Sequence, residues 1–172
     1  MINVVLVGLM GSGKSTVGAL IATATGRTLI DTDTAISTMT GQAVRQLWEE
    51  GGEEAYRQME SQVVLDALDG TVPCVIAAPG GVVLDPVVRA ALVDAFVVWL
   101  RTDPATLAER VRPGDHRPLL ADRPLEVLSA MALDRAHLYA DVADVTIDTD
   151  LVDAESVATA VLQHLRRLPA NS

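Results

Sequence analysis

Aromatic residues, cysteine and positive charge are all scarce in this chain of 172 residues. Aromatic side chains make up 3% of the chain, so valine, leucine, isoleucine and alanine must fill most of its core. The one cysteine, Cys74, excludes an internal disulfide and is consistent with a reducing compartment. We therefore expect a cytoplasmic protein in which Cys74 is a buried structural thiol rather than a reactive one.

Long hydrophobic runs are absent as well. The longest ones, such as residues 95–100, have the length of a strand and fall far short of the roughly 20 residues that a membrane span needs. The apolar run near the N-terminus has no basic segment before it, so it does not resemble a signal peptide. We expect no association with a membrane.

Negative charge dominates the chain, because 23 acidic side chains outnumber 13 lysines and arginines and leave a net charge of −10. This excess argues against general nucleic-acid binding, since a polyanion would be repelled. Any anionic ligand must instead be held by local groups of Lys, Arg and backbone N–H.

The order of apolar segments indicates the fold class. The chain has the length of one domain and shows no internal repeat or linker, so we expect a single domain over residues 1–172. Strands are expected at residues 2–7, 28–31, 72–77, 96–100 and 142–147. Helices are expected at residues 15–25, 42–50, 53–68, 86–93, 104–111, 124–139 and 153–168. This alternation predicts an α/β fold of three layers, in which helices cover both faces of a five-stranded parallel sheet.

Residues 8–15, GLMGSGKS, match the phosphate-binding pattern G-x-x-x-x-G-K-[ST], with an expected strand before them and an expected helix after them. Glycines let successive backbone N–H groups turn toward phosphate oxygens, Lys14 can reach the β- and γ-phosphates, and Ser15 can give an oxygen to Mg²⁺. The loop alone does not separate a kinase from a GTPase or an ATPase. The expected ATP contacts here are Gly11, Ser12, Gly13, Lys14, Ser15 and Thr16.

Two carboxylates, Asp31 and Asp33, follow the second expected strand. The carboxyl ends of neighbouring parallel strands share one crevice, so both should lie near the phosphate-binding loop. A carboxylate there can hold Mg²⁺ or accept a proton from a substrate hydroxyl, and we expect Asp31 to join Ser15 at the metal. The structural alternative is capping of the next helix, which aspartate also does well.

With these and further motifs, the sequence resembles the shikimate kinases. The resemblance extends to residues 52–60 (GEEAYRQME), Gly80-Gly81, residues 117–120 (RPLL) and residues 135–139 (RAHLY), in the family's order and spacing. It implies a P-loop kinase fold like that of the nucleoside monophosphate kinases, with a substrate-binding region at about 33–61 and a lid at about 112–123. It also implies Mg²⁺-dependent transfer of the ATP γ-phosphate to the 3-hydroxyl of shikimate, in the biosynthesis of aromatic amino acids.

The resemblance assigns roles to individual side chains. Catalysis would fall to Lys14, Asp33 and Arg117, with Arg117 reaching the phosphates from the lid and Arg110 lying beside the adenine. The acceptor would be bound by Asp33 at its hydroxyls, by Arg57 and Arg135 at its carboxylate, and by backbone at Gly80 and Gly81. Independently of the family, the rigid fork of arginine suits a carboxylate, and two arginines in one pocket would be costly without an anion.

Each of these side chains also has a purely structural alternative. Arg57 could pair with Glu53 or Glu60 along a helix, Arg110 and Arg135 could be solvated, Gly80-Gly81 could be a simple turn, and Trp48 and Tyr56 could line the pocket or fill the core. Where the family usually has three glycines this chain has Pro79-Gly80-Gly81, and proline lacks a backbone donor. Two other functions stay open: a kinase for another cyclic carboxylated polyol, and a nucleotide-binding regulatory protein without catalysis. We expect a monomer.

Overall fold

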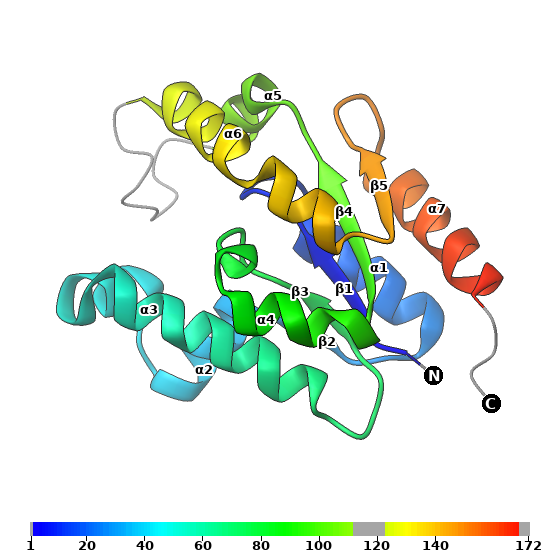
Figure 1. Cartoon of the computed structure of the whole chain (residues 1–172), viewed down its shortest axis with the longest axis horizontal. Helices are drawn as coiled ribbons and strands as arrows, with labels where there is room; N and C mark the ends of the chain where they lie inside the picture. Colours follow the sequence, from blue (N-terminus) through cyan, green and yellow to red (C-terminus); the bar gives the residue numbers. More distant parts are fainter. Residues whose placement is uncertain (1, 112–122, 169–172) are drawn as a thin grey trace.

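The computed structural model describes residues 2–111 and 123–168, and of residues 44 and 45 only the backbone. One sheet of five strands lies at its centre, in the order β2-β3-β1-β4-β5, and all four neighbouring pairs are parallel (Figure 1). The strands are β1 (Val4–Val7), β2 (Leu29–Asp31), β3 (Val75–Ala77), β4 (Phe96–Arg101) and β5 (Val145–Asp148). The predicted five-stranded parallel sheet is confirmed.

Helices cover both faces of this sheet. They are α1 (Lys14–Thr25), α2 (Thr32–Thr40), α3 (Val44–Leu68), α4 (Pro86–Ala91), α5 (Pro104–Arg110), α6 (Pro124–Val142) and α7 (Ala154–Arg167), with short 3₁₀ turns η1 (Val82–Leu84) and η2 (Leu92–Asp94). One apolar cluster joins the sheet to α1 and α7, and a second joins its other face to α3, α4, α5 and α6. The fold therefore has the three α/β/α layers that the sequence predicts.

Strand β1 explains why the first apolar run is continuous rather than alternating. Val5 and Val7 belong to the cluster under α3 and α6, whereas Val4 and Leu6 belong to the cluster under α1 and α7. All four side chains are fully buried. A central strand between two helical layers needs apolar residues on both faces.

Aspartates begin several of the helices that follow strands and turns. The side chains of Asp31, Asp85, Asp103 and Asp153 cap α2, α4, α5 and α7 by accepting hydrogen bonds from backbone N–H groups in the first turn, at 2.7–3.2 Å. Each cap satisfies a donor that the helix itself leaves unpaired, which is typically worth about 1 kcal/mol. Part of the chain's acidity thus has a structural use.

The structure differs from the sequence-based expectation at α2 but not at α3. Residues 32–40 form a helix that was not predicted, whereas the two helices expected at 42–50 and 53–68 are present as the two parts of α3. Gly52 separates these parts, because its φ of 77° and ψ of 174° are not helical and kink the chain there. The third strand is also shorter than expected, and β5 starts at Val145 because α6 continues to Val142.

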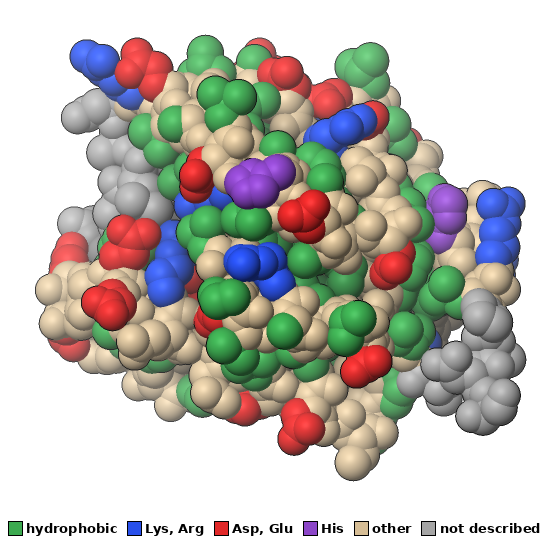
Figure 2. Space-filling view, viewed as in Figure 1, with side chains coloured by type: hydrophobic (Ala, Val, Ile, Leu, Met, Phe, Trp, Pro, Cys, Tyr) green, Lys and Arg blue, Asp and Glu red, His purple; other side chains and the backbone are tan. Residues whose placement is uncertain are grey.

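Cysteine burial, surface charge and helix hydrophobicity can be compared with what the composition predicts. Cys74 is buried, and burial raises the pKa of its thiol, as expected of a structural cysteine. Acidic and basic side chains are interspersed on the face in Figure 2, with hydrophobic side chains between them. Among the helices of the described residues, none is both long and apolar enough to cross a bilayer.

Gly8, where β1 enters the phosphate-binding loop, should tolerate no side chain. Its φ is 141°, and a Cβ there would lie 2.5 Å from the carbonyl oxygen of Leu100. We expect Gly8→Ala to lower the free energy of unfolding by about 3 kcal/mol, measured by chemical denaturation. Gly26→Ala is the matched control: its φ is 66°, no described atom lies within 4 Å of the new Cβ, and about 1 kcal/mol is expected. Equal stability of the two variants would contradict this interpretation.

Candidate active site

A pocket of about 360 Å³ opens at the end of the sheet where β1, β2 and β3 finish. It is lined by the phosphate-binding loop, the start of α2, the kinked part of α3, the loop after β3, and single arginines from α5 and α6. The predicted site residues in its wall are Gly11, Gly13, Lys14, Ser15, Thr16, Asp31, Asp33, Arg57, Gly80, Gly81, Arg110 and Arg135. Ser12 lies behind the loop, 2% exposed, with its Oγ 3.5 Å from the Lys14 ammonium.

The phosphate-binding loop owes its shape to glycine. Gly8, Gly11 and Gly13 have φ values of 141°, 82° and 93°, which L side chains rarely adopt. The loop leads into the N-terminus of α1, where unpaired N–H groups and the helix dipole favour an anion. Lys14 Nζ donates to the carbonyl oxygens of Gly8 and Leu9 at 2.8 and 2.9 Å, so its ammonium lies across the loop.

Ser15 and Asp31, the predicted magnesium ligands, are in direct contact. The Ser15 hydroxyl donates to Asp31 Oδ2, while Asp31 Oδ1 accepts from the backbone N–H and the hydroxyl of Thr34, both at 3.2 Å. Asp31 therefore caps α2 and faces the pocket at the same time. Within the described residues no cluster of three or more acidic, His or Cys side chains could hold a metal. Two oxygen donors suit Mg²⁺, which keeps several waters and binds phosphate.

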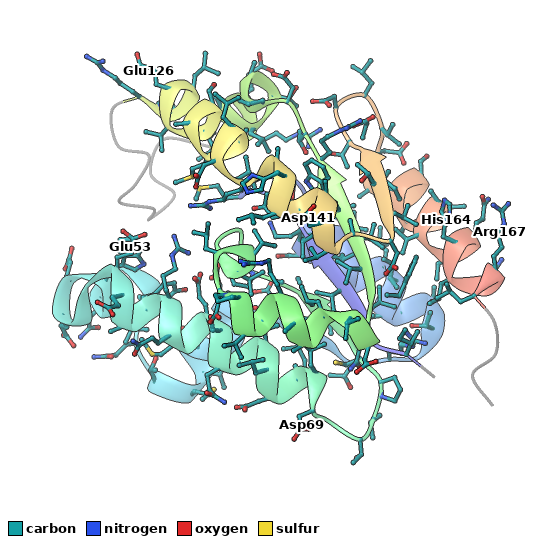
Figure 3. All side chains as sticks on the ribbon, viewed as in Figure 1. Glu53, Asp69, Glu126, Asp141, His164 and Arg167 are labelled. Atoms are coloured by element: carbon teal, nitrogen blue, oxygen red, sulfur yellow. The ribbon has the colours of Figure 1, made fainter. Side chains whose placement is uncertain are left out.

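The kink at Gly52 presents one face of α3 to the pocket. Arg57 Nη1 donates to Glu60 Oε2 at 2.7 Å, and Arg57 Nη2 donates to Glu53 Oε1 at 3.4 Å. Glu53, labelled in Figure 3, extends from α3 on the side that faces α6. The guanidinium of Arg57 also lies 5.8 Å from the ring centre of Trp48. Arg57 thus makes both of its alternative ion pairs and still lines the pocket.

Burial controls the charges of this face. It raises the pKa of Glu60, whose side chain is 5% exposed, against the opposing attraction of Arg57. Burial is the largest single influence on Arg57 and disfavours its charged form, but the attraction and hydrogen bonds of Glu60 and Glu53 together outweigh it and raise the pKa of the guanidinium. Arg57 therefore carries a full positive charge in a partly desolvated pocket.

Arg135 is not solvated, so that alternative is wrong. The residue is 7% exposed, and its Nη1 donates to the carbonyl oxygen of Gly80 at 3.1 Å. The Tyr139 hydroxyl donates to the same oxygen at 2.5 Å. Arg135 Nε is buried and has no hydrogen-bond partner among the described residues. A buried, unsatisfied N–H on a cation is costly, and an anion in the pocket would satisfy it.

Gly80 and Gly81 join the two arginines, which is more than a simple turn does. A Cβ at Gly81 would lie 2.7 Å from Arg57 Nη1, and one at Gly80 would lie 3.3 Å from the carbonyl oxygen of Gly8. A side chain at Gly81 would displace the Arg57 guanidinium, and one at Gly80 would press on the phosphate-binding loop, so glycine lets this loop approach both closely.

Arg110 also has backbone partners. Its Nη2 donates to the carbonyl oxygen of Thr149 at 2.6 Å, which holds the side chain at the rim of the pocket. Arg117 and the predicted lid, apart from Arg123, lie outside the described residues, so their roles stay predictions. Two contributors were not predicted as site residues: Glu60, which was named only as a possible structural partner of Arg57, and Tyr139, which was given no role. Their spacing in the sequence could have indicated them: Glu60 follows Arg57 by three residues and Tyr139 follows Arg135 by four, and both spacings place two side chains next to each other on a helix.

The two tyrosines should ionise only on unfolding. Burial raises the pKa of Tyr139 to about 12, and burial together with the nearby Asp33 raises that of Tyr56 further. Above the ordinary tyrosine pKa of about 10 the folded chain then binds more protons than the unfolded one, so its stability falls as pH rises. We expect tyrosinate absorbance to appear together with the loss of circular dichroism in an alkaline titration. A tyrosine titrating near pH 10 in the folded chain would contradict both environments.

Comparisons with known proteins identify the family of this chain. The model of the family described as shikimate kinase matches residues 10–166. A shikimate kinase of Symbiobacterium thermophilum is 42% identical over 168 residues, which cover 95% of this chain and 96% of the relative. One of Mycobacterium tuberculosis is 41% identical over 167 residues, covering 94% and 92%.

A solved structure has the same fold. The shikimate kinase of Acinetobacter baumannii, in complex with shikimate, superposes with a TM-score of 0.93 at 31% identity, over 99% of this chain and 96% of that one. The resemblance seen in the motifs is thereby confirmed over nearly the whole length. On both its sequence and its fold, this chain belongs to the shikimate kinase family.

Proposed function

We propose that this chain is an ATP-dependent kinase that transfers the γ-phosphate of ATP to the 3-hydroxyl of shikimate. The observation that carries the proposal is the pair Arg57 and Arg135, which meet the Gly80-Gly81 loop in the same pocket as a phosphate-binding loop. Such a pocket fits an acceptor with a carboxylate. The Acinetobacter baumannii relative was solved with shikimate, which supports that acceptor.

The carboxylate of the acceptor would lie between the two arginines. Arg135 brings a buried charge whose Nε lacks a partner among the described residues, so an incoming carboxylate would satisfy it. Arg57 brings a rigid fork that is already oriented by Glu60. Arginine binds carboxylates through parallel, charge-assisted hydrogen bonds, which fix the orientation of the ligand as well as its affinity.

The phosphates of ATP would occupy the loop between β1 and α1. Backbone N–H groups at Gly11–Thr16 and the N-terminus of α1 would bind phosphate oxygens, and Lys14 would move from the carbonyl oxygens of Gly8 and Leu9 to the β- and γ-phosphates. We assign the adenine contact to Arg110 and a further phosphate contact to Arg117. Phosphoryl transfer depends chiefly on positioning and charge neutralisation, which these cations supply.

Ser15 and Asp31 would hold Mg²⁺, directly or through water. Their oxygens are in contact, they line the pocket beside Lys14, and hard oxygen donors are what this ion prefers. When bound, the ion neutralises charge on the phosphates. Asp33 would accept a hydrogen bond, and then the proton, from the hydroxyl of the acceptor.

A kinase for another cyclic carboxylated polyol is the second candidate, and Pro79 is the observation that favours it. This residue lines the pocket at a position where the family usually has glycine, and it brings no backbone N–H to the acceptor. The loss of this N–H would therefore affect most strongly how the pocket distinguishes acceptors with different hydroxyl patterns on the same carboxylated ring.

A coupled assay of ADP release, with shikimate, quinate and a non-carboxylated analogue as acceptors, tests the proposal. We expect turnover with shikimate, slower turnover with quinate, and almost none without a carboxylate. Preference for quinate would favour the second candidate. Nucleotide binding without turnover of any acceptor would make the chain a regulatory protein and end the kinase proposal.

Removing either arginine should impair the use of the acceptor more than that of ATP. Charge-assisted hydrogen bonds contribute about 1.5–3 kcal/mol, so Arg57→Ala and Arg135→Ala should each raise the acceptor KM by about 10- to 100-fold with a small change in the ATP KM. Arg101→Ala is the matched control, since this exposed arginine pairs with Asp148 outside the pocket. Unchanged acceptor binding in calorimetry of both folded pocket variants would exclude the carboxylate clamp.

A further inference from the structure

The side chain of Asp33 is held by a tyrosine. The Tyr56 hydroxyl donates to Asp33 Oδ1 at 3.0 Å, from a helix 23 residues further along the chain. Tyr56 is 2% exposed and packs in a small apolar cluster with Ile36, Leu47 and Val63. Its ring is therefore immobilised, and its hydroxyl is a fixed donor at the edge of the pocket.

Asp33 itself has little else to fix it. It lies in the first turn of α2 and is exposed to the open pocket. Among the described residues, the Tyr56 hydroxyl is its one hydrogen-bond partner, whereas Asp31 is bonded to both Ser15 and Thr34. An exposed aspartate without a partner samples several rotamers, so the bond from Tyr56 is what restricts the Asp33 carboxylate.

We propose that Tyr56 is a positioning residue for phosphoryl transfer. By binding Oδ1, it orients the Asp33 carboxylate so that Oδ2 remains for the acceptor hydroxyl. This inference rests on the proposed function, because Asp33 is the group assigned to that hydroxyl. Under this proposal the two parts of Tyr56 have separate roles: the aromatic ring packs in the core, and the hydroxyl positions Asp33.

Two effects of the hydroxyl oppose each other. A donor to the carboxylate occupies one of its two oxygens, which by itself would leave fewer positions for the proton, whereas the same donor places the other oxygen at the reacting hydroxyl, which speeds transfer. Phosphoryl transfer proceeds through a loose transition state in which positioning outweighs proton transfer. Loss of the hydroxyl should therefore slow the reaction.

The structural alternative is that Asp33 merely satisfies a buried phenol. Buried tyrosine hydroxyls usually find a partner, whatever the function of that partner. The alternatives differ in what the loss of the hydroxyl changes: a structural bond affects the melting temperature, while a positioning bond affects kcat.

Tyr56→Phe separates them, because it keeps the ring and removes only the donor. We expect a melting temperature within about 4 °C of the wild type and a kcat about 10- to 30-fold lower. The acceptor KM should rise less than about threefold, since Arg57 and Arg135 are unchanged. Thr25→Val is the matched control: it too deletes a hydroxyl donor with little change of shape, but one bonded at 2.8 Å to the Ile21 carbonyl oxygen within α1, outside the pocket, so kcat should stay within about threefold.

The outcomes are distinct from those of the acceptor assay. Wild-type turnover with shikimate is measured first and decides the proposed function. If the wild type is active and folded Tyr56→Phe keeps its kcat, the proposed function stands and the positioning role of Tyr56 is wrong. An equal fall of kcat in Tyr56→Phe and Thr25→Val would overturn it as well, because the effect would then not be specific to Asp33.

Discussion

The carbonyl oxygen of Gly80 joins α6 to the loop after β3 at one side of the pocket. Arg135 and Tyr139 of α6 both donate to it, although they lie 55 and 59 residues away along the chain. The next residue, Gly81, passes so close to the Arg57 guanidinium that a Cβ there would displace it. One short segment after β3 therefore fixes two arginines from two helices relative to each other, and both relative to the phosphate-binding loop.

The two arginines are stabilised in different ways. Arg57 donates directly to two carboxylates, whereas Arg135 donates to the carbonyl dipole of Gly80 and attracts the carboxylate of Glu60 without bonding to it. A carbonyl dipole leaves more of the field of a buried cation for an incoming anion than a direct ion pair does. This local positive field resolves the apparent conflict between a net charge of −10 and an anionic ligand.

Features that depend on short-range sequence patterns were predicted best. The glycine spacing at residues 8–15 and the β-branched runs of the strands are local, so the phosphate-binding loop and the parallel sheet could both be predicted from them. Helix α2 was missed because its sequence, TDTAISTMT, is rich in threonine, a weak helix former, and it is stabilised by packing against α3 through Ile36.

Contacts distant along the chain were out of reach from the sequence alone. The burial of Arg135, its bond to Gly80 and the bond from Tyr56 to Asp33 depend on how α3 and α6 meet the end of the sheet. Motif resemblance identified these positions as a set but could not give their partners. The break at Gly52 is local by contrast, so the glycine pair predicted from the sequence where the two parts of α3 separate.

The two carboxylate partners of Arg57 hold it unequally. Glu60 is almost fully buried and bonds at 2.7 Å, whereas the side chain of Glu53 is 54% exposed and lies at 3.4 Å. Under the proposed function, an incoming carboxylate would replace Glu53, which would return to water at little cost, while Glu60 would stay as the resident counterion. A neutral polyol would bring no charge to make this exchange, so it would be disfavoured without any steric barrier.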